Sequence, residues 1–229
     1  MNASLYRVEV DCPVCRETFS TSRVRSKFCV VESRDTDFCV YYKGCNPIFY
    51  EAAVCSKCGY AALYDRFTEI GPEDAGRVYS RFAGKWNGRD FGSERSIEDA
   101  LDAYKLALYC SQLRKDVTAD IFTSICMRMA WLYRIKGDTE EERRFLAHAL
   151  EQYMVLYDRG DTPEKMDEIT LIYLMGELNR RLGNADDAVI WFSRVVSHSM
   201  AGQKPLIVRM AREQWSMVRN TIKESGQDG

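Results

Sequence analysis

The sequence predicts an α+β protein, in which a small β-rich module precedes an all-α domain. Two observations lead to this prediction. Seven of the nine cysteines lie within the first 58 residues, among short β-prone stretches that turn residues separate. From about Pro72 onward, apolar residues recur instead at intervals of three and four, which is typical of amphipathic helices. We therefore divide the chain into a β-rich module at 1–70 and a helical domain at 71–229.

The composition excludes several classes of protein. The chain has 229 residues, of which 46% are hydrophobic and 29% charged, so it can bury an ordinary core. A formal net charge of −2 argues against a polycation that coats nucleic acid. No apolar run approaches the ~18 residues of a membrane span, and residues 1–15 lack the profile of a signal peptide. We expect a cytoplasmic protein with no membrane partner, whose cysteines are not disulfides.

Local signals predict the individual elements. The β-prone stretches at 5–10, 27–32 and 49–54 predict strands. In the second part, capping residues and glycines mark six or seven antiparallel helices with short connections. The predicted helix starts are Ser96 as the cap before Ile97, Asp138 after Gly137, Thr162 before Pro163, Asn184 after Gly183, and Pro205, whose helix runs to about Glu224.

The helices also repeat in a pattern similar to the tetratricopeptide signature, W-x2-L-G-x2-Y followed by A-x3-F. One copy consists of Ile172, Met175, Gly176, Asn179, Ala188 and Phe192, and an upstream copy of Cys126, Met129, Ala130, Tyr133, Leu146 and Ala149. The copies are offset by 46 residues, from 130 to 176, instead of about 34, which requires an over-long helix at 138–158. A plain helical bundle is the alternative. Small residues at both close-packing positions, Ala130 and Gly176, favour the repeat.

The strongest chemical signal is a pair of Cys-x-x-Cys motifs, Cys12-Pro13-Val14-Cys15 and Cys55-Ser56-Lys57-Cys58. Two residues between thiolates let both sulfurs of one tight turn face the same ion, and two such turns complete a tetrahedral shell. Gly59 suits the left-handed conformation that closes such a turn, whereas Arg16 departs from this ideal at the matching place.

These four cysteines predict a structural Zn²⁺, because a shell of four thiolates leaves no coordination position open for water or substrate. The 39 residues between the two pairs must form a folded insertion. Coordinated iron or a redox dithiol pair is the alternative.

The other five cysteines are expected to pack as small apolar side chains. Cys29, Cys39 and Cys45 have irregular spacing and form no further Cys-x-x-Cys motif, although a second metal site or a redox switch is the alternative. Cys110 and Cys126 fall on apolar helix stripes, which favours a place in the core.

Between the two cysteine pairs, hydrogen-bonding side chains gather in Arg34-Asp35-Thr36-Asp37-Phe38, in Tyr42-Lys43-Gly44-Cys45-Asn46-Pro47 and at Tyr50. Together with Cys12-Pro13-Val14-Cys15 and the run from Cys55 to Ala61, these motifs resemble the bacterial domain of unknown function family 2225 over nearly the whole chain. The resemblance implies zinc-binding cysteines near the N-terminus and tetratricopeptide-like helices behind them. It implies no reaction, so function has to be argued from the residues.

The segment between the cysteine pairs has two interpretations. Asp35 and Asp37 would share one face of a strand, and with Arg34 they could form an ion-pair network that ties loops together. Alternatively, polar side chains line a pocket that binds a small ligand or carries acid–base chemistry. The residues of this candidate pocket are Arg34, Asp35, Asp37, Tyr42, Asn46 and Tyr50. We favour the structural interpretation.

Two surfaces are candidates for binding a macromolecule. In a tetratricopeptide-like repeat the first helix of each pair lines a concave groove. Here the groove would consist of Met127, Trp131, Arg134, Tyr173, Glu177 and Arg180, which suit a protein or peptide partner. Trp131 is equally consistent with a core position. Separately, Arg23, Arg25 and Lys27 beside Phe28 form a basic patch that could contact nucleic acid, although three charges supply weak, salt-sensitive affinity.

Three hypotheses on function follow. The leading one is a non-enzymatic, zinc-stabilised interaction protein whose helical groove binds a protein or peptide partner. The second is an enzyme or small-ligand binder that uses the polar pocket around Arg34, Asp35, Asp37 and Asn46. No catalytic residue can be named for it, because the sequence contains no G-x-S-x-G, no H-E-x-x-H and no phosphate loop. The third is a nucleic-acid binder that works through the patch from Arg23 to Lys27.

Overall fold

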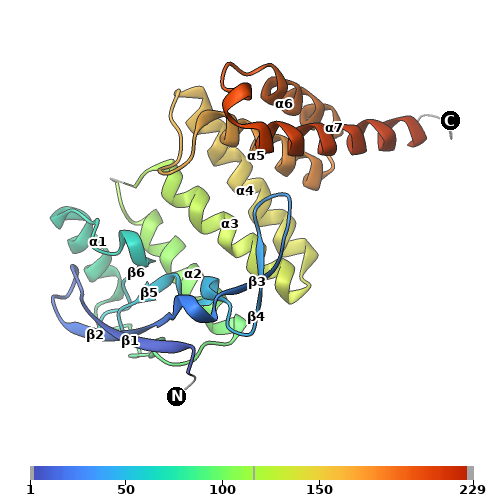
Figure 1. Ribbon diagram of the computed structural model, residues 1–229. Coiled ribbons are helices and arrows are strands. Elements are labelled where there is room, and N and C mark those ends of the chain that lie inside the picture. Colours follow the sequence, from blue (N-terminus) through green and yellow to red (C-terminus); the bar gives the residue numbers. More distant parts are fainter. Residues whose placement is uncertain (1–2, 116, 226–229) are drawn as a thin grey trace.

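The computed structural model describes residues 3–115 and 117–225 of the chain. Its N-terminal part consists of pairs of short strands, and the remainder is helical (Figure 1). Each pair is an antiparallel two-stranded sheet: β1 (Leu5–Asp11) with β2 (Thr18–Val24), β3 (Val30–Arg34) with β4 (Val40–Lys43), and β5 (Ala52–Val54) with β6 (Ala61–Leu63). This order of strands and helices confirms the α+β class.

Two predicted strands begin later than expected. Residues 27–28 belong to a 3-10 turn, η1 (Ser26–Phe28), and residues 49–50 to a second one, η2 (Pro47–Tyr50). The cause at η2 is local, because the side chain of Asn46 accepts a hydrogen bond from the N–H of Ile48 at 3.1 Å and Pro47 fixes the backbone angle φ. The chain therefore turns before it can extend into β5.

Seven helices follow within the described residues: α1 (Pro72–Phe82), α2 (Ile97–Gln112), α3 (Ala119–Lys136), α4 (Thr139–Asp158), α5 (Glu168–Leu182), α6 (Ala185–Ser197) and α7 (Pro205–Ser225). Most starts and stops agree with the predicted capping residues. Ser96 forms a capping box before α2, and Asp138 caps α4 by accepting a hydrogen bond from Glu141 N. Gly137 and Gly183 end α3 and α5 with φ of 84° and 87°, the left-handed conformation that glycine favours.

Helix α5 begins later than predicted. Thr162 and Pro163 lie outside it, because Lys165 adopts a left-handed φ of 67° and the chain forms a turn there. The cap is Asp167 instead, whose side chain accepts a hydrogen bond from the N–H of Thr170 at 3.0 Å.

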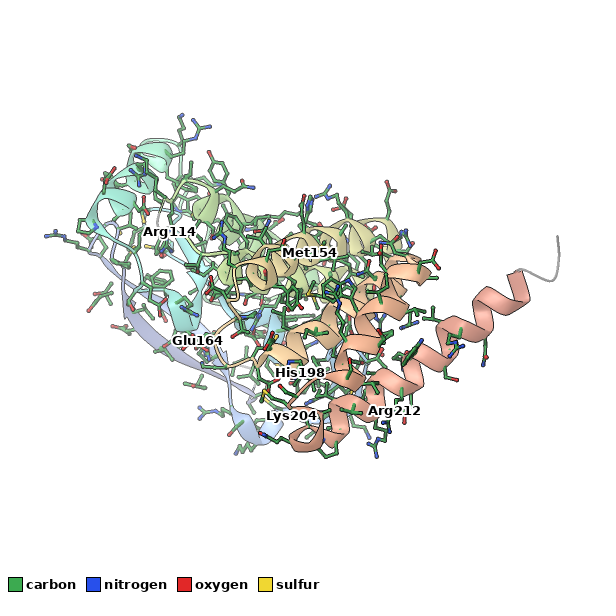
Figure 2. The ribbon with its side chains drawn as sticks, turned by 90° about the horizontal axis from the view of Figure 1, so that it is seen from above. Arg114, Met154, Glu164, His198, Lys204 and Arg212 are labelled. Atoms are coloured by element: carbon green, nitrogen blue, oxygen red, sulfur yellow. The ribbon has the colours of Figure 1, made fainter. Side chains whose placement is uncertain are left out.

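The connection between α6 and α7 reinforces this start. Lys204 pairs with the carboxylate of Asp167, and His198 Nε2 lies 3.4 Å from Glu168 Oε2. Figure 2 shows both His198 and Lys204 at this connection. The first turn of α5 is thus held from outside by residues that a local capping argument does not consider.

The hydrophobic core runs without interruption from the strands into the helices. Helix α2 packs against β5 and β6. At this contact Tyr104 donates a hydrogen bond to Ile48 O at 2.8 Å, and the N–H of Ala61 donates to Cys110 Sγ at 3.4 Å. β6 ends at Leu63 and α1 begins at Pro72, and the core continues across the proposed boundary between 70 and 71.

Successive helices from α3 onward pack against their neighbours in the chain. Gly176 of α5 lies so near α6 that a Cβ atom there would come within 2.8 Å of the Phe192 ring, so packing requires a glycine.

Figure 1 shows α7 extending past the other helices, and the loop between β3 and β4 reaching across to α3 and α5. Among the described residues, no helix combines the length and apolar character needed to cross a membrane.

Candidate metal centre and helical groove

Four cysteine sulfurs from two turns meet in the N-terminal part. The Sγ atoms of Cys12, Cys15, Cys55 and Cys58 all lie within 4.8 Å of one another. Two pairs that link the turns, Cys12 with Cys58 and Cys15 with Cys55, are each separated by 3.7 Å. Because a Zn–S bond is about 2.3 Å long, the edge of a tetrahedral four-sulfur site measures about 3.8 Å. The cluster therefore has the dimensions of a metal site and could hold a metal ion.

The two cysteine turns have the same backbone hydrogen-bond pattern. In each turn the backbone carbonyl of the first cysteine accepts a hydrogen bond from the N–H of the residue four positions later. The N–H of the same cysteine donates to the carbonyl of the residue five positions later. These bonds are Arg16 N to Cys12 O at 2.8 Å, Cys12 N to Glu17 O at 3.1 Å, Gly59 N to Cys55 O at 2.9 Å and Cys55 N to Tyr60 O at 2.8 Å. Gly59 has a φ of 80°, and Arg16 adopts the same left-handed region at 64° despite its side chain. The cost for a non-glycine residue is about 1–2 kcal/mol.

The chain after α1 covers the second turn. Trp86 donates from Nε1 to Ser56 O at 2.8 Å, and its ring lies over Gly59, where a Cβ atom would come within 2.6 Å of it. Cys12 and Cys55 are 1% and 0% exposed. Hydrogen bonds from Cys12 and Cys58 lower the pKa of Cys55, whereas hydrogen bonds within the cluster raise the pKa values of Cys12 and Cys58, so Cys55 is the thiol that ionises first.

The remaining cysteines stay outside this cluster. In the part of the chain that the structure describes, no other group of three or more His, Cys, Asp or Glu ligand atoms gathers. Burial raises the pKa of Cys39, Cys110 and Cys126 to about 12, so these side chains are protonated thiols in the core. Cys29 also has a raised pKa, first because of burial and then because of the nearby Cys45.

Residues 35–38, which we call the acidic segment, lie between β3 and β4 and against α3. Arg134 holds the fully buried Asp37 through two nitrogens, at 2.9 Å from Nη1 to Oδ1 and 2.6 Å from Nη2 to Oδ2. Trp131 donates from Nε1 to the same carboxylate at 3.2 Å. Asp35 accepts from Arg134 Nη1 at 2.6 Å and from the hydroxyl of Tyr41 at 3.0 Å. Both aspartates are therefore bound by one helix of the second part.

The same segment also contacts α5. Tyr173 donates to the carbonyl of Thr36 at 2.7 Å, and the hydroxyl of Thr36 donates to Glu177 Oε1 at 2.5 Å. The ring of Phe38 lies 5.7 Å from that of Tyr173, centroid to centroid. Arg181 lies 3.6 Å from carboxylate oxygens of both Asp35 and Asp37.

The electrostatics of this contact favour the ionised forms. Burial opposes ionisation of Asp37, but the hydrogen bond and charge of Arg134, with a smaller contribution from Arg181, outweigh it and lower the pKa. Burial likewise works against the charged form of Arg134, yet Asp37 and Glu142 raise its pKa. The buried Glu177 is held by Arg180 at 2.7 Å and Arg181 at 2.8 Å. Every buried charge of this network thus has an opposite partner.

The structure places two sets of candidate residues against each other. The six groove residues were expected to line an open surface, but Arg134, Trp131, Tyr173 and Glu177 all contact the acidic segment, and Met127 is 3% exposed. The groove is filled here because two arginines, Arg134 of α3 and Arg181 of α5, neutralise the carboxylates of the segment. Arg181 belongs to this contact and was not among the candidate residues, although its position one residue after Arg180 could have suggested it.

The six residues of the candidate pocket do not form one site. Asp35 and Asp37 belong to the contact with the helices, whereas Asn46 and Tyr50 border a separate cavity beside Arg95. Arg34 is exposed on β3. Tyr42 pairs with Val31 across the β3–β4 sheet. The two aspartates therefore belong to an ion-pair network that ties a loop to helices, but their cations are Arg134 and Arg181 and not the predicted Arg34.

The residues of the basic patch each lie over an aromatic ring. The Arg23 guanidinium is 4.0 Å from the ring centroid of Tyr64, the Arg25 guanidinium is 5.4 Å from that of Tyr6, and Lys27 Nζ is 5.1 Å from that of Phe28. Arg23 also borders a cavity of about 220 Å³ between strands and helices. The other cations there are largely paired, for example Arg66 with Asp120 at 3.0 Å and Glu164 at 2.5 Å, and Arg128 with Glu51.

Comparison with known proteins gives one match. A family model described as an uncharacterized protein conserved in bacteria (DUF2225) matches residues 5–218. The match spans both the cysteine cluster and the helices that hold the acidic segment. No curated protein and no solved structure matches the chain at a significant level.

Proposed function

The chain belongs to the bacterial DUF2225 family, and we propose that it is a zinc-stabilised, non-enzymatic interaction protein whose helical groove binds an acidic peptide segment. The observation that carries this proposal is the contact between the acidic segment and the faces of α3 and α5. In this conformation the bound segment comes from the same chain. A partner would bind by replacing it.

We infer that the metal is Zn²⁺, held by Cys12, Cys15, Cys55 and Cys58. The sulfur separations of 3.7 Å and the burial of the cluster support a closed tetrahedral site. When bound, zinc supplies a structural cross-link with an apparent binding free energy of about 10–16 kcal/mol. An isolated two-stranded sheet is at best marginally stable, so the link would strengthen the attachment of these sheets to the shared core. We propose a cytoplasmic location, where cysteines stay reduced and available to metal.

The cross-link also bears on the groove. The two cysteine pairs enclose residues 16–54, and the acidic segment lies near the middle of this enclosed stretch. A stretch whose ends are joined has fewer conformations available, so it loses less conformational entropy when its middle part docks on α3 and α5. Zinc binding and seating of the acidic segment are therefore expected to favour each other.

The chemistry of the groove defines its partner. Two carboxylates are held by Arg134 and Arg181, a backbone carbonyl by the hydroxyl of Tyr173, and an aromatic ring packs on the Tyr173 ring. Charge-assisted hydrogen bonds to arginine are both strong and selective for carboxylates. The preferred partner is thus a peptide that can form the same tight turn as residues 35–38, with two acidic residues spaced by one residue and followed by an aromatic one.

A tetratricopeptide-like arrangement of the helices is part of this proposal. The close packing of Gly176 on Phe192 and the full burial of Ala130 support it, because both small residues occupy the close-packing positions of the signature. In such repeats the first helix of each pair lines the concave face that binds partners.

The other two hypotheses have less support. An acid–base role for Asp35 and Asp37 requires free carboxylates, yet both are paired with Arg134. A nucleic-acid surface requires cations that are free to contact phosphate, yet Arg23, Arg25 and Lys27 each lie over a ring of the same chain.

Peptide binding in solution tests the proposal. The probe is a fluorescent peptide with the sequence of residues 33–41 and serine in place of Cys39, and the readout is fluorescence anisotropy. The wild-type chain should bind it weakly, since its own segment competes at an effective concentration on the order of millimolar. The double variant Asp35→Asn and Asp37→Asn should bind it at least about tenfold more tightly, because the groove then loses its charged occupant.

A matched peptide with asparagine at both acidic positions is the control. If the double variant, with native helix content by circular dichroism, binds both peptides equally or neither of them, the groove proposal is wrong. Phe38→Ala provides a milder variant that loosens the segment without changing charge. It should also bind the acidic peptide more tightly than the wild type, and it decides the question should the double variant not fold.

A further inference from the structure

Arg95 is a buried cation without a carboxylate partner. Its side chain is 5% exposed and lies in the connection before α2. Nε donates to Phe91 O at 2.8 Å, and Nη1 donates to Phe49 O at 2.9 Å and to Ala52 O at 2.7 Å. Nη2 is buried and has no hydrogen-bond partner among the described residues. The guanidinium is therefore held in place by carbonyls while one of its nitrogens stays unsatisfied.

The contrast with Arg134 shows what is missing. Arg134 is bound by three carboxylates, those of Asp35, Asp37 and Glu142. In the described part of the chain no carboxylate lies within ion-pair distance of Arg95. Burial accordingly lowers the pKa of Arg95, to about 10. The rings of Tyr50 and Phe91, at 5.5 and 5.9 Å from the guanidinium carbon, compensate the charge in part.

A cavity of about 440 Å³ lies beside this arginine. This volume falls within the usual range for small-molecule sites, about 300–1,000 Å³. Its border includes the cation of Lys43, the amide of Asn46 and the rings of Phe28 and Phe49, while Glu94 contributes a carboxylate. Cations and aromatic rings on one border match a ligand with an anionic head and an apolar body.

We propose that this cavity binds a small organic anion, whose carboxylate or phosphate head group pairs with Arg95 and Lys43. The inference goes beyond the proposed function, because the site shares no residue with the groove or the cysteine cluster. An unpaired charge in the interior is costly. Because the chain covers Nη2 here, a bound anion would supply the missing opposite charge once the Arg95 side chain turns this nitrogen toward the cavity. The partly exposed Asn46 can add a hydrogen bond, since its Oδ1 is used by Ile48 N while its Nδ2 is not engaged within the described residues.

Nuclear magnetic resonance on the full-length, zinc-loaded chain tests the site. The probes are benzoate, phenyl phosphate and the neutral benzamide, and the readout is the Nε–Hε signal of Arg95, assigned by its loss in Arg95→Gln. Benzoate or phenyl phosphate should shift this signal saturably, and the tighter of the two identifies the head group. Benzamide should bind at least about tenfold more weakly, because it lacks the charge-assisted hydrogen bond.

Three variants complete the test. Arg95→Gln should abolish anion binding, whereas Arg89→Gln, at an exposed arginine paired with Asp99 and Asp102, should leave it unchanged. Lys43→Ala should weaken binding about two- to fivefold, as expected for one exposed charge, and it decides the matter should Arg95→Gln not fold. An Arg95 signal that shifts with neither anion, or that shifts equally with benzamide, would overturn the proposal.

Discussion

Substitution of Asp37 by asparagine tests the contact between the acidic segment and the helices. The change keeps the shape of the side chain but removes its charge, so Arg134 loses a partner that it holds at 2.6 and 2.9 Å. Removing one partner of a buried ion pair costs about 3–5 kcal/mol. Arg134 retains Asp35 and Glu142, and asparagine retains one acceptor, so we expect the lower end, about 3 kcal/mol.

The assay is thermal unfolding of the zinc-loaded chain. For a chain of this length, a loss of about 3 kcal/mol lowers Tm by about 6–12 °C. Asp161→Asn is the matched control, because Asp161 is exposed, and it should change stability by less than about 0.5 kcal/mol. A Tm for Asp37→Asn within 2 °C of the control, a margin of about 0.5–1 kcal/mol, would refute the ion-pair account.

The pH dependence of the same pair of proteins gives an independent check. The pKa of Asp37 is lowered in the folded state, so its ionised form stabilises the fold at pH values above its ordinary pKa, about 3.9. This stabilisation is lost as the pH falls below that value. The difference in unfolding free energy between wild type and Asp37→Asn should therefore be constant above about pH 5 and shrink toward pH 3. Loss of metal in acid affects both proteins and cancels in the difference.

Two glycines give further predictions, each with a glycine control. Gly59→Ala should lower Tm and metal affinity together, since its Cβ would lie 2.6 Å from the indole ring of Trp86. Its control is Gly44→Ala, at a φ of 83° with nothing within 4 Å, which should cost only the backbone strain of about 1–2 kcal/mol. Gly176→Ala should destabilise by about 1–3 kcal/mol through overlap with Phe192, measured by urea unfolding. Gly76→Ala, in open space on a helix, should instead stabilise by about 0.5–1 kcal/mol.

Features that depend on neighbouring residues were predictable from the sequence. The Cys-x-x-Cys pairs bring two sulfurs of one turn together, and the caps at Ser96 and Asp138 act within one helical turn. Even there, the start of α5 was predicted too early, because Lys204 supports Asp167 from a distant part of the chain. Local signals thus predicted most helix boundaries, although the local turn at Asn46 and Pro47, which delays β5, was missed as well.

Features that depend on distant pairing were not predictable. The acidic segment and the groove residues were both singled out, but as two separate sites, because Asp37 and Arg134 are almost a hundred positions apart. The complementary charges were the one available hint. Arg95 carries no sequence signal at all, since its importance arises from burial without a carboxylate partner, and burial of a loop residue depends on packing.

Metal content measured by elemental analysis tests the central claim most directly. The cysteine cluster should carry one zinc ion per chain in freshly purified wild-type protein, because its four sulfurs lie within 4.8 Å of one another and two of their separations, at 3.7 Å, match a tetrahedral edge. Cys58→Ser should lose the zinc, whereas Cys29→Ser, which changes a cysteine outside the cluster, should retain it. A wild-type protein without stoichiometric zinc, or equal zinc in both variants, would contradict the account.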